Sequence, residues 1–253
     1  MKDRIKAAIR RLGYDIRKVE HLPQVEAQGA VVAWPWAGRT IRFYVENRFD
    51  LIGRDMFNGR FFEAEELDFL RTIADPSGAF LDVGANVGNH TVYFAAVIGA
   101  AQVLAFEPGD FAYPRLAFNV ALNDLNRRVT LHRMALSNRD GEASMHLTYA
   151  DNHGSLSISE GQDGTQLVPV ARGDTLVGDT HVTFIKVDVE RHEFEVLAGL
   201  SGVIARDRPL VMVEVMVAER ARFDAWLAAQ GYASLREFPR YGDIVNVVAG
   251  PAR

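Results

Sequence analysis

Acidic side chains stand at the ends of three short apolar runs in this chain. Asp82 lies within the first run, Glu107 directly follows the second, and Asp188 and Glu190 end the third. Nearly continuous apolar runs of this length are typical of parallel strands that are covered on both faces. Since an open parallel sheet binds its ligands beyond the carboxyl ends of its strands, we expect these carboxylates to surround one site.

A glycine-containing turn follows Asp82. Gly84 and Gly88 permit a tight turn and a close approach of the backbone to a ligand, and Asn86 between them tolerates left-handed geometry. Their spacing differs from the glycine patterns that bind dinucleotides or nucleotide phosphates. The Asp82 carboxylate repels phosphate but attracts an ammonium or sulfonium group, and Glu107 can accept hydrogen bonds from both hydroxyls of a ribose. Together these residues predict a nucleoside ligand that carries a positive charge.

The third acidic segment allows two interpretations. Strand alternation places Lys186, Asp188 and Glu190 on one face, where burial of three ionisable groups is costly unless they serve one another or a ligand. In the functional interpretation, Asp188 and Glu190 face a ligand. In the structural one, Glu190 and Glu193 only favour the start of the next helix, and Lys186 pairs with an acid. Glu214 ends a further apolar run and is expected at the same rim.

The elements that must position these residues follow a break in the chain at residues 75–78. Apolar, β-rich runs then alternate with helical patterns, which predicts βαβ units around a mostly parallel, doubly wound sheet in an α/β fold. The predicted strands are 79–83, 103–107, 129–135, 183–189 and 210–215, with helices near 88–98, 110–123, 191–200 and 218–230. Two last runs, at 232–238 and 243–249, predict a terminal antiparallel hairpin.

The part of the chain before the break has a different pattern. It reads as a first helix within residues 1–18, a short strand at about 40–45 and a helix at about 62–73 with glutamates in its first turn. We therefore divide the chain into an N-terminal extension and lid, residues 1–75, and a main domain, residues 76–253.

Composition and charge exclude several classes of protein. The chain has 253 residues, of which 48% are hydrophobic, and it has no cysteine, so thiol catalysis and cysteine-bound metal centres are excluded. It contains no apolar run long enough to span a membrane and no signal-peptide pattern, so we expect a cytoplasmic protein. The net charge of −5 argues against general nucleic-acid binding. Residues 1–18 carry seven basic groups with apolar residues at helical spacing, which indicates either a helix packed on the body or weak contact with anionic lipid or a glycolipid.

Several short motifs, in order, resemble the FkbM family of S-adenosylmethionine-dependent methyltransferases. The resemblance covers roughly residues 60–215 and rests on the segments 80–91, 105–108, 119–123, 135–137, 154–157, 185–190 with Glu193, and 208–214. It implies a class I methyltransferase fold, a Rossmann-like sheet of seven strands. It also implies O-methylation of a hydroxyl on a sugar, glycolipid or natural product, although some relatives are thought to methylate nitrogen on peptide side chains.

The resemblance also implies roles for individual residues. Asp82 and the turn from Gly84 through Asn86 to Gly88 would cradle the methionine half of the cofactor, and Glu107 would hold its ribose. The remaining carried-over residues are Ala135 and Leu136 near the adenine, Asp188 and Glu190 facing the methyl group and the acceptor, and Glu63 as a lid contact. The sequence departs from the family at Arg191, where glycine is usual, and at Gly173, where leucine is usual.

Methyl transfer requires little more than alignment of the acceptor and removal of its proton. Asp188 or Glu190 is the expected general base, with His90 and His192 as rivals. The histidines show no metal-binding spacing, and we predict no metal site, although Asp188, Glu190 and Glu214 offer oxygen ligands for Mg²⁺.

Other functions remain compatible with these residues. They are N-methylation of a peptide or amino sugar, an NAD-type oxidoreductase, a base-modifying nucleic-acid methyltransferase, and a binding protein that has lost catalysis. The missing dinucleotide glycine pattern and the acid at the turn disfavour the oxidoreductase. A homodimer is compatible with the sequence.

Overall fold

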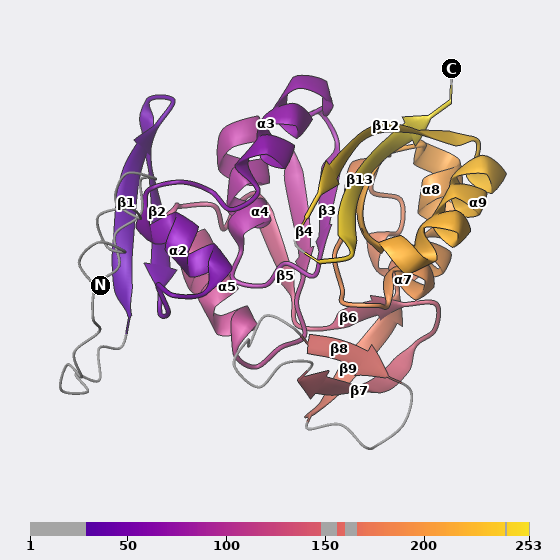
Figure 1. Cartoon of the computed structure of the whole chain (residues 1–253). Helices are drawn as coiled ribbons and strands as arrows, with labels where there is room; N and C mark the ends of the chain where they lie inside the picture. Colours follow the sequence, from indigo (N-terminus) through magenta and orange to yellow (C-terminus); the bar gives the residue numbers. More distant parts are fainter. Residues whose placement is uncertain (1–28, 148–155, 160–165, 241, 253) are drawn as a thin grey trace, which may run out of the picture.

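The main body of the protein is a seven-stranded sheet. The computed structural model describes residues 29–147, 156–159, 166–240 and 242–252. The strands of the sheet run in the order β12-β13-β11-β10-β3-β4-β5 (Figure 1). Their bounds are β3 Ala79–Val83, β4 Gln102–Phe106, β5 Val129–His132, β10 Val182–Val187, β11 Leu210–Met216, β12 Tyr232–Pro239 and β13 Ile244–Pro251.

The sheet confirms the predicted doubly wound α/β fold. The five strands from β11 to β5 are parallel, whereas β13 is antiparallel to both β11 and β12, so the predicted terminal hairpin closes one edge. The chain order reverses between β3 and β10, which lie side by side in the middle of the sheet. Such a switch point is where an open α/β sheet forms its ligand-binding crevice.

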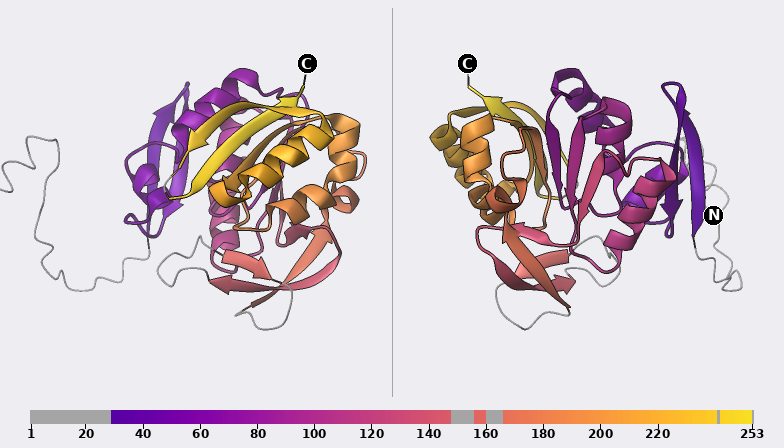
Figure 2. Two further views of the ribbon diagram at one scale, coloured as in Figure 1. Left: turned by 45° about the vertical axis from the view of Figure 1, so that its right-hand side comes forward. Right: turned by 180° about the vertical axis from the view of Figure 1, so that it is seen from behind.

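Helices cover both faces of this sheet (Figure 2). Alternation along the strands explains why: Phe80 and Phe184 belong to one apolar cluster, and their chain neighbours Leu81 and Ile185 belong to another. The first cluster is covered by α3 Ala64–Ile73, α4 Asn89–Val92 with the π-helical turn η1 Tyr93–Ile98, and α5 Ala112–Leu122. The second is covered by α6 Gly173–Val177, α7 Glu193–Gly199, α8 Ser201–Asp207 and α9 Arg220–Gln230, which follows the 3-10 turn η2 Val217–Glu219.

The N-terminal part forms a separate antiparallel hairpin and a short helix. The predicted strand at 40–45 is present as β2 Arg39–Val45, but its partner β1 Ala30–Trp36 was not predicted. After β2 come α2 Leu51–Phe57 and then α3, close to the predicted helix at 62–73. The predicted helix within residues 1–18 lies outside the described residues.

Side chains of α5 tie this hairpin to the main domain. Asn119 lies on α5 and Asn123, one turn later, caps its C-terminal end. Their Oδ1 atoms accept hydrogen bonds from the backbone of β2 at Tyr44 and Arg42, at 2.7 and 2.9 Å. The two amides thus take the place of a neighbouring strand along this edge of β2. Trp34, Phe43 and Phe61 pack ring against ring on the inner side of the hairpin.

A second, four-stranded sheet was not predicted. Its order is β6-β9-β7-β8, with β6 Ala135–Ser137, β7 Gly141–Leu147, β8 Leu156–Ser159 and β9 Gln166–Arg172. The predicted strand at 129–135 is therefore wrong at its end: β5 stops at His132, and the chain leaves the main sheet and starts β6. Alternating small and branched residues such as Ala143, Val168 and Val170 are buried in this sheet, so it has a core face of its own.

Candidate active site

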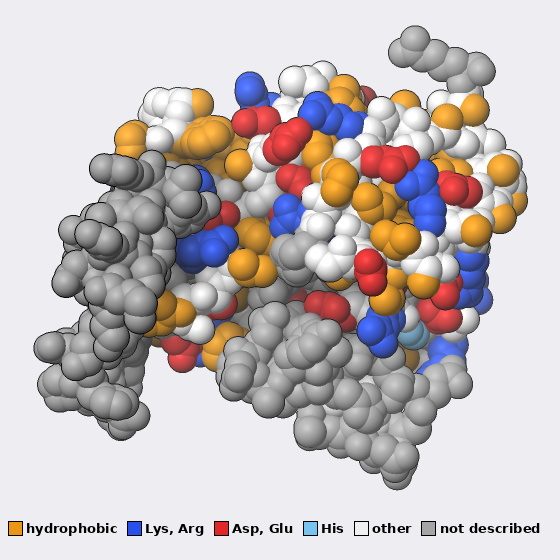
Figure 3. All heavy atoms as spheres, viewed as in Figure 1, with side chains coloured by type: hydrophobic (Ala, Val, Ile, Leu, Met, Phe, Trp, Pro, Cys, Tyr) orange, Lys and Arg blue, Asp and Glu red, His pale blue; other side chains and the backbone are white. Residues whose placement is uncertain are grey.

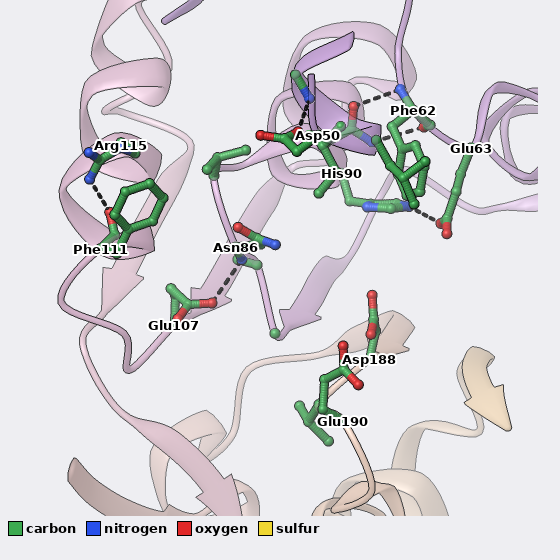
Figure 4. A pocket seen from close by; sticks show the side chains of 18 of the residues that line it. Asp50, Phe62, Glu63, Asn86, His90, Glu107, Phe111, Arg115, Asp188 and Glu190 are labelled. Atoms are coloured by element: carbon green, nitrogen blue, oxygen red, sulfur yellow. Dashed lines mark hydrogen bonds and ion pairs between the residues drawn. The ribbon is translucent and has the colours of Figure 1, made fainter. Parts of the chain in front are cut away.

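A cavity of about 550 Å³ lies at the carboxyl ends of β3, β4, β10 and β11. Most of the predicted site residues line it, namely Glu63, Gly84, Asn86, Glu107, Ala135, Leu136, Asp188 and Glu190. Figure 4 shows Glu107 and Asn86 on one side of this space, Asp188 and Glu190 on another, and Glu63 beside His90 at the far end from Glu107. The structure thus brings together residues that are separated by up to 127 positions, from Glu63 to Glu190.

The turn after β3 is fixed by close packing against β10. Gly84 has φ of +80°, and a Cβ atom there would collide with the carbonyl oxygen of Asp188. The Asp188 amide in turn donates to the Val83 carbonyl oxygen at 3.1 Å. Asn86 adopts the left-handed φ of 48°, as its residue type allows. The backbone of this turn therefore forms one wall of the cavity. At Gly84, where the turn comes closest to Asp188, it carries no side chain.

Glu107 is held by the turn that follows it and by the turn after β3. Its Oε1 accepts a hydrogen bond from the Gly109 amide at 2.7 Å, and its Oε2 accepts one from the Asn86 amide at 2.9 Å. Burial raises the pKa of Glu107 to about 7, because loss of hydration outweighs these two backbone donors. The carboxylate is thus held in one orientation and partly desolvated. Each oxygen keeps a lone pair that can accept a hydrogen bond from a further donor.

Asp82 and Gly88 do not line the cavity. Asp82 is fully buried: its Oδ2 accepts a hydrogen bond from Thr91 Oγ1 at 2.5 Å, and its Oδ1 lies 3.4 Å from Lys186 Nζ. At Gly88, a Cβ atom would lie 2.9 Å from Leu116 Cδ1, so this glycine lets α5 pack against the turn. Both residues stand behind the wall that the turn presents to the cavity.

Lys186 links the turn to the acids of β10. Its Nζ donates to the Gly84 carbonyl oxygen at 2.8 Å and lies 3.4 Å from both Asp82 and Asp188. Burial alone would lower the pKa of Lys186, but the charges of Asp188 and Asp82 outweigh it and raise the pKa. The lysine is therefore a permanent cation at the floor of the cavity. It pairs with acids, as the structural interpretation of this segment predicted.

Asp188, Glu190 and Glu214 line the acidic end of the cavity, and Glu193 is close enough to interact electrostatically with Glu214. Burial, followed by repulsion from Asp188, Glu190 and Glu193, raises the pKa of Glu214 to about 10, which favours its neutral form, a hydrogen-bond donor. The pKa of Glu193 is raised to about 7, mainly by burial. Asp188 is about one-third exposed and faces Lys186.

Glu190 and the next residue have unusual backbone angles. Glu190 has φ of 53° and Arg191 has φ of 75°, so both occupy the left-handed region. The Arg191 amide donates to Glu193 Oε1 at 3.0 Å. A glycine at position 191, which the resemblance noted above leads us to expect, would adopt this angle without strain. Arginine keeps the same turn at an energetic cost.

Glu63, at the cavity wall, forms a second cluster of charged side chains with His90 and Arg240. Its Oε2 lies 3.0 Å from His90 Nε2, although the geometry does not meet that of a hydrogen bond, so the contact is electrostatic. Its Oε1 lies 3.1 Å from Arg240, in the turn between β12 and β13. Burial would raise the pKa of Glu63, but His90, Arg240 and Lys186 lower it to about 2. Glu63 is therefore ionised throughout the physiological range.

The two rival histidines differ in position. His90 lines the cavity, whereas His192 does not and instead has its Nε2 3.0 Å from the hydroxyl of Ser137 on β6. Among the described residues, no three histidine or acidic side chains are arranged to hold a metal ion. The same part of the chain has no helix of the length and apolar character needed to cross a membrane.

The sequence did not indicate the residues that cover the cavity. The segment from β2 to α2 contributes Asp50, whose carboxylate caps α2 through the Gly53 amide at 2.5 Å. On α5, the Arg115 guanidinium lies 3.5 Å from the ring centre of Phe111 and pairs with Glu46. The Arg115–Glu46 pair joins segments 69 residues apart, which no local pattern in the sequence signals. The other two contacts are local, and an aspartate before a helix is a common capping signal.

Comparison with known proteins places the chain in a family. Residues 82–234, more than half of the chain, match the Methyltransferase FkbM domain. The chain is 30% identical over 156 residues to the hexuronic acid methyltransferase AglP of Haloferax volcanii, which covers 59% of this chain and 62% of that protein. It is 34% identical over 119 residues to the methyltransferase sdnD of Sordaria araneosa, which covers 46% of this chain and 45% of that protein.

The matches thus span less than two-thirds of the length of these curated relatives. Among solved structures, a methyltransferase FkbM from Methylobacillus flagellatus KT superimposes with a TM-score of 0.50 at 18% identity, over 73% of this chain and 51% of that one. This likeness shows the shared fold. The match of residues 82–234 to the family domain establishes that the chain is a member of the FkbM methyltransferase family.

Proposed function

We propose that the protein transfers a methyl group from S-adenosylmethionine to a hydroxyl group of a sugar, a glycolipid or a natural product. The observation that carries this proposal is the single cavity that has Glu107 and the glycine turn on one side and Asp188, Glu190 and Glu214 on the other. The similarity to a relative named for hexuronic acid supports a sugar acceptor.

The residues around Glu107 fit the cofactor. Glu107 would accept hydrogen bonds from the ribose hydroxyls, and the backbone from Gly84 to Asn86 would face the methionine part. Apolar side chains that line the same side suit a flat purine ring, namely Phe106, Pro108, Ala135, Leu136 and Met145. Asp82 would act through Lys186 and the turn, because its own carboxylate does not reach the cavity.

The acidic residues fit the acceptor. When bound, S-adenosylmethionine supplies a methyl group on a positively charged sulfur, which is already electrophilic. Asp188 or Glu190 would accept the proton of the acceptor hydroxyl while the new carbon–oxygen bond forms and the carbon–sulfur bond breaks. Glu214, in its neutral form, would donate a hydrogen bond to another oxygen of the acceptor. Lys186 would hold the Asp188 carboxylate in place.

Calorimetric titration with S-adenosylmethionine and S-adenosylhomocysteine tests the cofactor. The native chain should bind both, and Glu107→Gln should weaken binding at least about tenfold because a charged acceptor of two hydrogen bonds is lost. Glu219→Gln is the control, since Glu219 is exposed and, within the described part of the chain, forms an ion pair with Arg222 alone. Binding of NADH in place of S-adenosylmethionine would refute the proposal.

Transfer of a radioactive methyl group to glucuronic acid and its glycosides tests the acceptor. We expect Asp188→Asn to reduce kcat by about 100-fold or more while cofactor binding persists, because the general base is lost. Full activity of both Asp188→Asn and Glu190→Gln would exclude these carboxylates as the base and leave His90 as the candidate.

A further inference from the structure

A second hollow, of about 440 Å³, adjoins the cavity. The two share Leu51, Phe62 and Glu63 as lining residues, so they meet around these three side chains. The far wall of the second hollow is formed by the end of β12, including Phe238. It therefore lies between α2, the start of α3 and the terminal hairpin.

The position of Glu63 shows which end of the cavity this hollow meets. Glu63 interacts electrostatically with both Lys186 and Glu214, which belong to the acidic end. In Figure 4, Glu63 lies on the side of the cavity away from Glu107. The second hollow therefore adjoins the acceptor side of the cavity, away from the nucleoside side, and Leu51, Phe62 and Glu63 stand between the two.

Most charged side chains of the second hollow are already paired. Glu63 and Glu66 each pair with Arg240, at 3.1 and 3.0 Å. Asp55 accepts from Arg60 at 2.7 Å. The other two acids pair in the same way, Glu65 with Arg236 and Glu237 with Arg220, both at 2.7 Å. Figure 3 shows acidic and basic side chains interspersed over α3 and the hairpin.

Arg54 is the exception. Among the residues that the structure describes, its nearest carboxylate oxygen, on Asp55, is 3.7 Å away and is already engaged by Arg60, and about half of the Arg54 side chain is exposed. An arginine in this state can donate paired hydrogen bonds to hydroxyl or carboxylate oxygens of a ligand. The ring of Phe62, which is only partly buried and lines the same hollow beside Arg240, offers apolar surface against which a sugar ring can pack.

We propose that the second hollow binds a further sugar unit of the acceptor, with Arg54 as its hydrogen-bond donor, so that the enzyme modifies the end unit of an oligosaccharide in preference to a single sugar. This inference rests on the proposed function, because it assumes that the reacting group in the cavity belongs to a sugar. It makes Arg54 a residue that determines acceptor length.

The chain provides a closely matched control for Arg54. Arg71, on α3, is exposed to the same extent, and its Nε also lies 3.7 Å from one aspartate, Asp68. Arg71 lines neither hollow. The variants Arg54→Ala and Arg71→Ala thus remove the same charge from similar surroundings, and only one of them alters the second hollow.

The experiment titrates native protein and both variants, each saturated with S-adenosylhomocysteine, with methyl glucuronide and with a hyaluronan tetrasaccharide that ends in glucuronic acid. We expect native protein and Arg71→Ala to bind the tetrasaccharide at least about tenfold more tightly than the monosaccharide, and Arg54→Ala to lose most of that difference. Affinity for methyl glucuronide should be the same in all three proteins.

Two results would overturn the inference in distinguishable ways. If Arg54→Ala and Arg71→Ala bind the tetrasaccharide equally well, or if native protein binds both sugars alike, the second hollow is not a sugar site, and the proposed methyl transfer still stands. If neither sugar binds to any of the proteins, the sugar acceptor is refuted together with the hollow, while cofactor binding separately tests the rest of the proposed function.

Discussion

Glu107 gives the site a dependence on pH that can be measured at the level of one residue. Its pKa is raised to about 7 by burial, so it gains a proton as the pH falls below neutrality. A protonated carboxyl accepts fewer hydrogen bonds from ribose hydroxyls. We therefore expect S-adenosylhomocysteine to bind roughly tenfold more weakly at pH 6 than at pH 8, by calorimetry. In Glu107→Gln, the weaker binding should not change with pH in this way. A native affinity that is flat between pH 6 and 8 would contradict this role.

Arg191 lowers the stability of the protein because its backbone is in the left-handed region. At its φ of 75°, arginine pays roughly 1–2 kcal/mol that glycine does not, offset in part by the greater freedom of glycine in the unfolded chain. Arg191→Gly should therefore raise the free energy of unfolding by roughly 0.5–1 kcal/mol in urea titrations. Arg208, at φ of 52°, is the contrast: its guanidinium donates to the carbonyl oxygens of Gln230 and Gly231, so Arg208→Gly should destabilise the protein. Equal effects of the two substitutions would contradict this explanation.

Single residues of the site could be predicted where the end of an apolar run decides their place, whereas strand alternation does not extend to Glu190, because β10 ends at Val187 and Glu190 is left-handed. The positions of Glu107 and Asp188 follow from the ends of apolar runs and from the way parallel strands meet at one edge. Asp82 lies on the same edge, yet its carboxylate turns inward to Lys186, because a buried lysine on the neighbouring strand β10 requires a counter-charge. No pattern within one strand reveals a partner on the next.

Arg240, in the turn of the terminal hairpin, supports the cavity through its ion pair with Glu63, which lines it. Arg240 is mostly buried and pairs with two buried carboxylates, Glu63 and Glu66, whereas Arg236 on the same hairpin pairs with the exposed Glu65. Arg240→Met should cost about 3–5 kcal/mol in the free energy of unfolding, because it removes the arginine partner of two buried carboxylates at once. Arg236→Met should cost less than about 1 kcal/mol.

Activity should separate the two hairpin variants as well. With Arg240 lost, one cation that lowers the pKa of Glu63 is gone, so Glu63 should hold its position beside His90 less firmly. We expect kcat/KM to fall in Arg240→Met, measured well below its melting temperature, and to stay near the native value in Arg236→Met. If both variants retain native stability and activity, the hairpin does not support the cavity.

Among the elements, those with a repeating pattern were predictable and those defined by their partners were not. The parallel strands and the terminal hairpin follow from apolar runs and turn residues. The four-stranded sheet was missed because β6 has only three residues and directly continues what reads as one strand from Val129. The strand β1 contains Pro35 and lies on an edge, which weakens its strand pattern.

At the scale of the whole molecule, the N-terminal part and the main domain share one core. Phe61, Leu67 and Leu70 belong to the same apolar cluster as Phe80 and Phe184 of the central strands. We therefore expect one cooperative thermal transition, with the same midpoint by circular dichroism and by tryptophan fluorescence. Leu67→Ala should lower the free energy of unfolding by about 2–5 kcal/mol and shift both signals together. Two separate transitions would instead favour independent folding of residues 1–75 and 76–253.

The amide of Asn119 has a further consequence. Its Oδ1 accepts from the Tyr44 amide of β2 at 2.7 Å, and its Nδ2 donates to the Val87 carbonyl oxygen in the turn after β3 at 2.8 Å. One side chain therefore connects the turn that would face the methionine part of the cofactor with the hairpin that carries Trp34 and Trp36. A small shift of the turn would change the surroundings of both indole rings, so the chain contains its own optical reporter: binding of S-adenosylhomocysteine should alter its intrinsic emission without any added label.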